Sequence, residues 1–466
     1  MQITTAINKW IKHFSDNTVN IAPLITFRIV FGLMMFASTL RFILKGWIND
    51  FYVTPKYYFT YYGFDWVKPL EENSMYILFG ILLLSSLFIA FGFFYRISIV
   101  LFFLVFTYIE LIDKTNYLNH YYFISLMSFI LIFLPLNRHF SIDVYFRICK
   151  EKTKVQSWTI NFIKLQIAFV YIFAGISKLN YNWLIEAQPL INWLKHQSDF
   201  PIIGSLLLND ITAYLFSWGG AIFDLFIVFI LISKRWRIYG YILVVIFHLL
   251  TSIMFPIGVF PLVMIGSTLI YFDEKIHLKI INLISRFTLK INESKTEYIY
   301  NIKKSFKPIY KMLFVSFFIL QLILPLRYLM YPGKLFWTEQ GYRFSWRVML
   351  IEKAGYAQFY IHEPVKDRKM LIESRNYLTP QQEKMMATQP DMILQFAHHI
   401  SNTFKDSIII ERNGEIINLG KSPKVTADIK VSLFNKGSRS FIDNNINLTG
   451  EKRGFSNKSW ILPYED

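Results

Sequence analysis

The sequence contains a single cysteine and few charged residues. With Cys149 as its only cysteine, the chain cannot form an intramolecular disulfide. Charged residues make up 17% of the 466 residues, whereas soluble domains contain about 25%. Hydrophobic residues make up 54% of the chain and lie mostly in long runs before residue 332. The composition therefore excludes an ordinary soluble protein and favours one that is embedded in a membrane.

Several motifs of common enzymatic and binding sites are also absent from the sequence. It contains no metal-ligand cluster, phosphate-binding glycine loop or serine nucleophile elbow. His398 and His399 are adjacent, so on a helix they would point about 100° apart, and we expect no metal there. The net charge of +17 comes from short clusters of Lys and Arg between apolar runs. This pattern fits a membrane better than a nucleic acid.

Nine apolar runs before residue 332 are candidates for helices that cross a bilayer, which requires roughly 20 predominantly apolar residues. The first run is too long for a signal-peptide core and lacks a cleavage pattern, so we expect it to be retained. The pair of runs around Pro256 could instead form a re-entrant hairpin. We predict a multi-pass α-helical membrane bundle of eight or nine helices in residues 1–331. The predicted spans are 22–46, 75–94, 96–112, 119–136, 159–178, 211–233, 237–256, 258–272 and 311–330.

The distribution of Lys and Arg between these spans predicts the orientation of the bundle. If the N-terminus is cytoplasmic, the inner segments hold most of the basic residues, including the Lys-rich stretch 275–310. The outer loops hold only Lys56, Lys68, Lys114 and Lys195. By the positive-inside rule, residues 332–466 then lie outside. Loops 47–74, 113–119 and 179–210 are expected on the same side, facing this C-terminal domain.

Residues 332–466 have the sequence pattern of a water-exposed domain. Hydrophobic and polar residues alternate in 358–363, 407–411 and 428–434, which is typical of half-buried strands. Thr379-Pro380 resembles a capped helix start, and helical spacing continues to Phe404. We predict an extracytoplasmic, mainly-β, sandwich-like domain with one inserted helix.

Ionisable residues within membrane spans are candidates for functional sites because they are costly to bury. They are Arg28, Arg41, His120, Lys178, Asp224 and His248. Lys178 shares a helix face with Tyr171 and Gly175, and the small glycine is expected to leave room for a ligand. In an apolar pocket Lys178 could be neutral and act as a base.

Each of these ionisable residues also has a structural interpretation. Lys178 could extend to the lipid headgroups from its helix end. His120 and His248 could be structural residues, while Asp224 and Arg28 could form polar pairs between helices.

Several blocks of the sequence, spread over most of the chain, resemble a known family. They are Asp113-Lys-Thr with Asn119-His120, Tyr171 to Leu179 with Asn182-Trp183, Phe247-His248 with Phe255 to Pro261, Gly341 to Trp346, Tyr377 to Pro380 with Asp391-Met392, and Ser459 to Pro463. In these blocks and their spacing, the chain resembles the vitamin K-dependent gamma-carboxylase family, including bacterial members with the HTTM membrane domain.

This resemblance implies an enzyme that uses reduced vitamin K, such as menaquinol or phylloquinol, with O2 and CO2 as co-substrates and no metal. Quinol epoxidation would generate a strong base, which removes a γ-proton from glutamate in a peptide or protein so that CO2 can add. The resemblance implies Lys178 and His120 as catalytic residues. It further implies Asn119, Tyr171 and His248 as cofactor-binding residues and Tyr342 and Trp346 as residues that bind the glutamyl substrate.

The sequence departs from the animal members of the family at two positions. Ser177 replaces a lysine that precedes the base, and Ile351 replaces a functional histidine. Two alternatives therefore remain open, namely a quinol epoxidase that acts on another acceptor and a non-catalytic protein that binds a quinone or lipid. We expect a bacterial inner membrane location with the C-terminal domain in the periplasm, and the endoplasmic reticulum membrane is the alternative.

Overall fold

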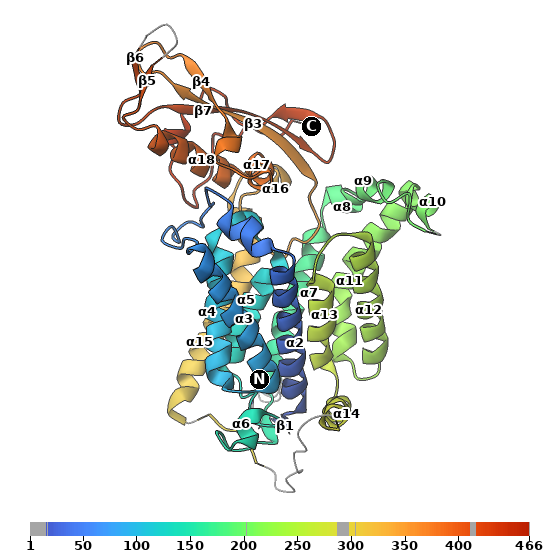
Figure 1. The fold of residues 1–466 in the computed structure, drawn as a ribbon. Coiled ribbons are helices and arrows are strands. Elements are labelled where there is room, and N and C mark those ends of the chain that lie inside the picture. The colour runs from blue at the N-terminus through green and yellow to red at the C-terminus, as the bar shows by residue number, and fades with distance from the viewer. Residues whose placement is uncertain are drawn as a thin grey trace, which may run out of the picture.

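The computed structural model describes Ser15 and residues 17–201, 203–286, 298–302, 304–410 and 416–465. Figure 1 shows a bundle of long helices with a β-rich domain at one end. Within the described part, seven helices are long and apolar enough to cross a membrane. They are α2 (Ala22–Leu44), α3 (Glu72–Phe91), α4 (Tyr95–Ile112), α7 (Trp158–Lys178), α11 (Asp210–Ile232), α12 (Arg237–Met254) and α15 (Lys307–Ile323), which continues in the 3₁₀-helix η5 (Leu324–Met330).

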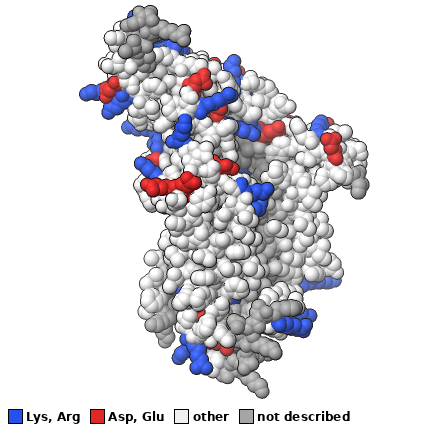
Figure 2. Space-filling model, viewed as in Figure 1, with Lys and Arg blue, Asp and Glu red and all other residues white. Residues whose placement is uncertain are grey.

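Two further apolar helices are shorter, namely α5 (Asn119–Phe133) and α13 (Phe260–Thr268) with its extension η3 (Leu269–Tyr271). Each of the nine predicted spans thus contains a helix, which confirms the multi-pass membrane bundle. Helices α12 and α13 form an antiparallel pair whose turn lies at Pro256. Figure 2 shows, on the face in view, a broad band of uncharged residues along the bundle, between charged residues towards both of its ends. Such a band is expected of a surface that faces lipid.

The end of the bundle away from the C-terminal domain carries the short elements β1 (Thr18–Asn20), β2 (Lys154–Gln156), α6 (Ile142–Tyr145), α14 (Glu274–Ser285) and η4 (Lys304–Phe306) (Figure 1). Near this end Arg28 is buried, and its Nη1 donates a hydrogen bond to the carbonyl oxygen of Leu136 at 2.8 Å. Arg28 therefore makes polar contacts, but its partners are backbone carbonyls in the loop after α5 and not the second helix that the sequence predicted.

The other end carries the loops that the charge distribution predicts to be outer, with the π-helix η1 (Asn49–Val53), the 3₁₀ turn η2 (Lys114–Asn116) and the short helices α8 (Tyr181–Leu184), α9 (Leu190–Lys195) and α10 (Gly204–Leu207). Side-chain contacts join each of the loops 47–74, 113–119 and 179–210 to the C-terminal domain. The side-chain amides of Gln395 and Gln382 donate to Thr60 at 2.9 Å and to Asp113 at 2.8 Å, respectively, and Lys436 pairs with Glu186 at 2.5 Å. All three loops therefore face the domain, as the charge distribution predicted.

The C-terminal domain is built on a four-stranded antiparallel sheet with the order β4-β3-β7-β8. Its strands are β3 (Lys353–His362), β4 (Lys369–Ile372), β7 (Val425–Leu433) and β8 (Ser438–Ser440), and β5 (Ile408–Ile410) pairs with β6 (Ile416–Asn418) in a separate hairpin. Short helical segments complete the domain: α16 (Leu335–Thr338), η6 (Ser374–Asn376), α17 (Pro380–Met386), α18 (Pro390–Thr403) and η7 (Leu448–Gly450). The predicted β-rich domain is confirmed.

Two details of this domain differ from the prediction. The layer that covers the sheet is helical, with Phe396 of α18 packed edge-on against Phe359 of β3 at a centroid distance of 5.0 Å. The single predicted helix begins at the Thr379 capping box as expected, but it is divided into α17 and α18. Pro390 explains the break, because proline lacks a backbone donor and disfavours helical geometry in the residue before it.

Candidate functional site

Lys178 is buried at the end of α7, where it contacts an acidic residue of the neighbouring helix. Its side-chain Nζ lies 2.5 Å from Oδ2 of Asp224 in α11, and Lys178 is only 5% exposed. The same Nζ lies 5.5 Å from the centroid of the Trp183 ring. The interpretation in which Lys178 extends to the headgroups is therefore wrong, whereas the predicted pairing of Asp224 between helices is confirmed.

Gly175 explains how these two helices come close enough for the pair to form. A Cβ atom on Gly175 would lie 2.8 Å from the backbone nitrogen of Leu225 and 2.7 Å from its side chain. The expectation that Gly175 leaves room for a ligand is therefore wrong, because α11 occupies that space. Its actual effect is to let α11 approach α7, which brings Asp224, the residue before Leu225, within reach of Lys178.

A largely apolar cavity lies beside the Lys178–Asp224 pair. Its empty space, including the open mouth, is about 760 Å³. Tyr171 and His248 also line it, and the Tyr171 hydroxyl lies 2.9 Å from His248 Nε2. The other ring nitrogen of His248, Nδ1, is buried and has no hydrogen-bond partner among the described residues. The walls include Val170, Ala174, Phe216, Phe247, Phe255, Ile257, Phe260, Met264, Val348 and Met349.

His120 and Asn119 lie in a second cavity that adjoins the first. The ring of Phe260 lies between the two histidines, with its centroid 5.9 Å from that of His120 and 5.9 Å from that of His248. The cavities share a wall made of Ile257, Phe260, Val348 and Met349. Lys178 and His120 therefore lie in adjoining cavities at the same end of the bundle, as expected, but the structure does not bring them into one cavity.

The shared wall is held in part by residues 341–349, which we call the interdomain segment. The side-chain amide of Asn119 donates to the carbonyl oxygen of Arg347 at 3.0 Å and so ties this segment to the start of α5. Phe344, Trp346 and Met349 have φ angles of 63°, 59° and 56°. Left-handed backbone at non-glycine residues is strained and tends to occur at functional sites.

The two residues expected to bind a glutamyl substrate are separated along this segment. Trp346 is buried in the bundle, stacked on Tyr122 with a centroid distance of 5.0 Å, and lines neither cavity. Tyr342 lines a third pocket, which lies between the bundle and the C-terminal domain. The structure therefore places neither residue beside Lys178.

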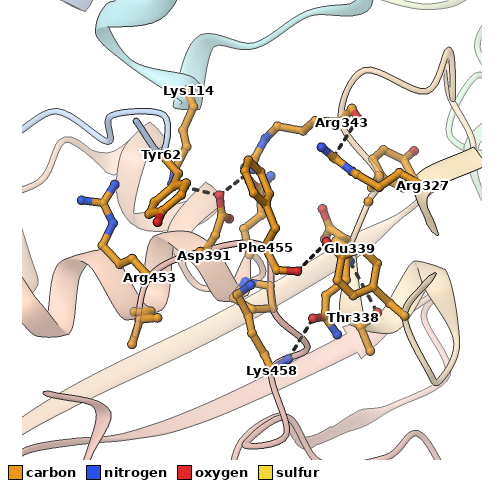
Figure 3. Close-up of a pocket in the computed structure, with 18 of the residues that line it drawn as sticks. Tyr62, Lys114, Arg327, Thr338, Glu339, Arg343, Asp391, Arg453, Phe455 and Lys458 are labelled. Atoms are coloured by element: carbon orange, nitrogen blue, oxygen red, sulfur yellow. Dashed lines mark hydrogen bonds and ion pairs between the residues drawn. The ribbon is translucent and has the colours of Figure 1, made fainter. Parts of the chain in front are cut away.

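This interdomain pocket is rich in charged residues. Figure 3 shows side chains of both domains gathered around Asp391, which pairs with Lys114 Nζ at 2.9 Å and with Arg343 Nη1 at 2.7 Å. The Lys and Arg residues in its lining are Lys114, Arg327, Arg343, Arg453 and Lys458, whereas Glu339 and Asp391 are its only Asp and Glu residues within the described part of the chain. The pocket therefore has an excess of positive charge.

Local hydrogen bonds fix the position of Lys114, and burial and neighbouring charges shift the pKa values of Lys114 and Asp391. The Asp113 carboxylate accepts hydrogen bonds from the backbone N–H of Thr115 at 2.9 Å and from the side-chain amide of Gln382 at 2.8 Å. These bonds fix the turn that carries Lys114. Burial lowers the pKa of Lys114 to about 8. Burial alone would raise the pKa of Asp391, but Arg343 and Lys114 hold it well below its usual range.

No role was predicted from the sequence for Lys114, Arg343 or Asp391. All three lie in the sequence blocks that carry the family resemblance, so a signal was present. The sequence could not show that they pair, because Lys114 and Arg343 come from parts of the chain that are distant from Asp391.

Two family models match the chain. Residues 17–275, more than half of the chain, match the model of the HTTM domain. Residues 306–466 match the model described as the vitamin K-dependent gamma-carboxylase, lumenal domain. No solved structure matches the chain. The first model covers the bundle from β1 to the start of α14, and the second covers α15 and the C-terminal domain. The chain therefore belongs to the vitamin K-dependent gamma-carboxylase family.

Proposed function

We propose that this protein is a vitamin K-dependent gamma-glutamyl carboxylase that uses a reduced naphthoquinone, O2 and CO2. One observation carries the proposal. Lys178 is buried in an apolar cavity at the end of the bundle that faces the C-terminal domain, and a pocket with excess positive charge lies between the two domains. An apolar cavity suits the quinol, which arrives from the lipid, while a cationic pocket suits an acidic peptide, which arrives from water.

The residues of the Lys178 cavity fit a quinol ring. Aromatic and aliphatic side chains form most of the wall, and Lys178, Asp224, Tyr171 and His248 supply its titratable groups. When bound, reduced vitamin K would supply the electrons that activate O2 and yield a base strong enough to remove a glutamate γ-proton. Lys178 would accept the proton of a quinol hydroxyl at Nζ, and His248 Nδ1 is available to hydrogen-bond a ligand oxygen.

The apolar wall would also protect the reaction. A base able to remove a glutamate γ-proton is quenched by water, so the site must exclude water during turnover. The side chains of Phe247, Phe255 and Phe260 line the cavity and leave few polar atoms to hold water. The shared wall with the His120 cavity contributes further apolar surface on that side.

The interdomain pocket is the proposed entry site for the glutamyl substrate. Arg327 and Lys458 form no ion pair with other described residues, so they are available to a substrate carboxylate. A carboxylate could also approach Lys114 and Arg343 in competition with Asp391. The interdomain segment connects the sites, because Tyr342 and Arg343 line this pocket while Val348 and Met349 line the Lys178 cavity.

A quinol epoxidase that serves another acceptor is the second candidate function. The observation in its favour is Ile351, which packs against the apolar core of the C-terminal domain, at the position where the animal relatives have a functional histidine. For either enzyme, we propose a bacterial inner membrane with the C-terminal domain in the periplasm, and the endoplasmic reticulum is the alternative.

The test uses purified protein in nanodiscs, supplied with reduced vitamin K, O2, ¹⁴C-bicarbonate and a Glu-containing peptide. Vitamin K epoxide and carbon fixed in the peptide are measured separately. The carboxylase proposal expects both products, epoxide alone identifies the second candidate, and neither product identifies a non-catalytic binding protein. Lys178→Ala should abolish both products. Lys164→Ala is the matched control, because Lys164 lies in the same helix α7 but does not line either cavity.

A further inference from the structure

The Lys178 cavity contains a second ionisable group in direct contact with the proposed base. Among the described residues, four titratable side chains line this cavity: Tyr171 and Lys178 from α7, Asp224 from α11 and His248 from α12. Of these, only Asp224 contacts Lys178, at 2.5 Å, and both members of the pair are at most 8% exposed in their side chains. The lining residues from α13 and from the interdomain segment carry no charge. Asp224 is therefore the one acidic residue of the described lining that contacts Lys178.

Burial makes this pair sensitive to the loss of either partner. An unpaired ammonium ion in apolar surroundings is strongly disfavoured and tends to release its proton. A carboxylate in hydrogen-bond contact compensates the charge. Because one proton lies between the two groups, its transfer converts an ammonium and a carboxylate into an amine and a carboxylic acid. The net charge of the cavity does not change.

We propose that Asp224 is a positioning residue that holds Lys178 in the cavity and sets the pH range in which Lys178 is a free amine. Asp224 takes the proton from Lys178 across their contact, and the amine so formed can accept a proton from an acidic hydroxyl in the cavity. That step leaves Lys178 as an ammonium beside a neutral Asp224. The inference rests on the proposed function, because it assumes that Lys178 is the base.

The experiment measures the free amine of Lys178 directly and does not depend on turnover. Protein in nanodiscs is pulsed with acetic anhydride at a series of pH values, because only the neutral amine reacts. Mass spectrometry then gives the fraction of Lys178 that is acetylated. Lys195, an exposed lysine that pairs with Asp210 at 2.9 Å, serves as an internal reference in every sample. Epoxide formation is measured in parallel.

Three variants are compared with the wild type. Asp224→Asn removes the charge, so half-maximal labelling of Lys178 should move by about one pH unit or more to lower pH, a tenfold change in the free amine. Asp224→Glu keeps the carboxylate and should stay close to the wild-type curve. Asp224→Ser removes the charge with a smaller side chain, and it replaces Asp224→Asn if that variant does not yield monodisperse protein. The Lys195 curve should be the same in all samples.

The possible results separate this inference from the proposed function. A shift in Asp224→Asn or Asp224→Ser that Asp224→Glu reverses supports the inference, even in a protein that forms no epoxide. An unchanged Lys178 curve in the variants that lack the carboxylate overturns it, even in a protein that forms epoxide. A purely structural role would change the yield of folded protein without moving the labelling curve, and that result also overturns the inference.

Discussion

Two lysines of α7 illustrate how local surroundings determine what a residue can do. Lys178 pairs with Asp224 inside the apolar cavity, whereas Lys164 lies with its Nζ 5.7 Å from the ring of Tyr271 towards the opposite end of the helix. Both are lysines in a predicted span, so helix assignment alone does not distinguish them. The distinction comes from what the neighbouring elements place beside each side chain, which is Asp224 of α11 for Lys178 and Tyr271 of η3 for Lys164.

At the residue scale, the pKa of Lys114 predicts how binding of an acidic peptide depends on pH. Its pKa is about 8, lowered by burial, so it carries a positive charge below that pH and loses the charge as the pH rises through it. If the interdomain pocket binds the acidic substrate, the KM for a Glu-containing peptide should rise between pH 7 and 9. The expected change is about tenfold, the value of one hydrogen bond to a charged group.

Lys114→Arg is the matched variant for this measurement, because arginine stays protonated throughout that range. Its KM should be independent of pH between 7 and 9. The prediction fails if the wild type and Lys114→Arg show the same dependence. Epoxide formation without peptide should follow the same pH profile in both proteins, since Lys114 does not line the Lys178 cavity.

The sequence predicted the ionisable residues of the site better than their partners. Lys178, Asp224 and His248 were recognised as costly groups within spans, and charge placed Lys178 and His120 near the same interface. The pairing of Lys178 with Asp224 depends on how two helices pack, and no local pattern encodes that. The wall that separates His120 from Lys178 likewise includes Val348 and Met349, which are distant from both residues in the sequence.

At the element scale, the contact between α7 and α11 depends on Gly175. Gly175→Ala should place its Cβ atom 2.8 Å from the backbone of Leu225 and force the helices apart. Overpacking of this kind costs about 1–3 kcal/mol, so the melting temperature in detergent should fall. The Lys178–Asp224 contact should lengthen as well, and acetylation of Lys178 should then shift to lower pH.

Gly219→Ala in α11 is the control for this substitution. A Cβ atom there meets nothing within 4 Å, and alanine is favoured over glycine in a helix by about 1 kcal/mol. The melting temperature of Gly219→Ala should therefore be equal to or above that of the wild type. Equal stability of the two variants would contradict the role assigned to Gly175.

Gly175 also shows where helix periodicity stops being informative. The spacing of Tyr171, Gly175 and Lys178 correctly predicted that they share one face of α7, and two of them line the cavity. It could not tell whether the space at the glycine is filled by a ligand or by another helix. In the C-terminal domain, the alternating pattern similarly predicted β3 and β7, but it did not reveal that helices cover their sheet.

At the scale of the whole molecule, the distribution of charge predicts which end of the bundle faces outwards. In a Cys149→Ser background, Val365→Cys places a thiol in the C-terminal domain at a site that is 87% exposed. Ile148→Cys places one at the opposite end, at a site that is 50% exposed. A membrane-impermeant maleimide added to intact cells or spheroplasts should label the Val365→Cys protein and leave the Ile148→Cys protein unlabelled until the membrane is opened.

Each of these two variants is the control of the other, because both sites are exposed to reagent after detergent is added. Labelling of Ile148→Cys in intact cells, with protection of Val365→Cys, would reverse the orientation. That result would also place the interdomain pocket on the cytoplasmic side and contradict an outer glutamyl substrate.

The interdomain segment determines whether the bundle and the C-terminal domain can bind their ligands when they are expressed as separate fragments. Tyr342 and Arg343 complete a pocket whose other side is formed by Tyr61 and Lys114, while Val348 and Met349 complete the walls of two cavities in the bundle. Expression of residues 1–331 alone would therefore leave both cavities without part of their walls. Expression of the C-terminal domain alone would leave its pocket half formed, so only the two fragments together could reconstitute binding.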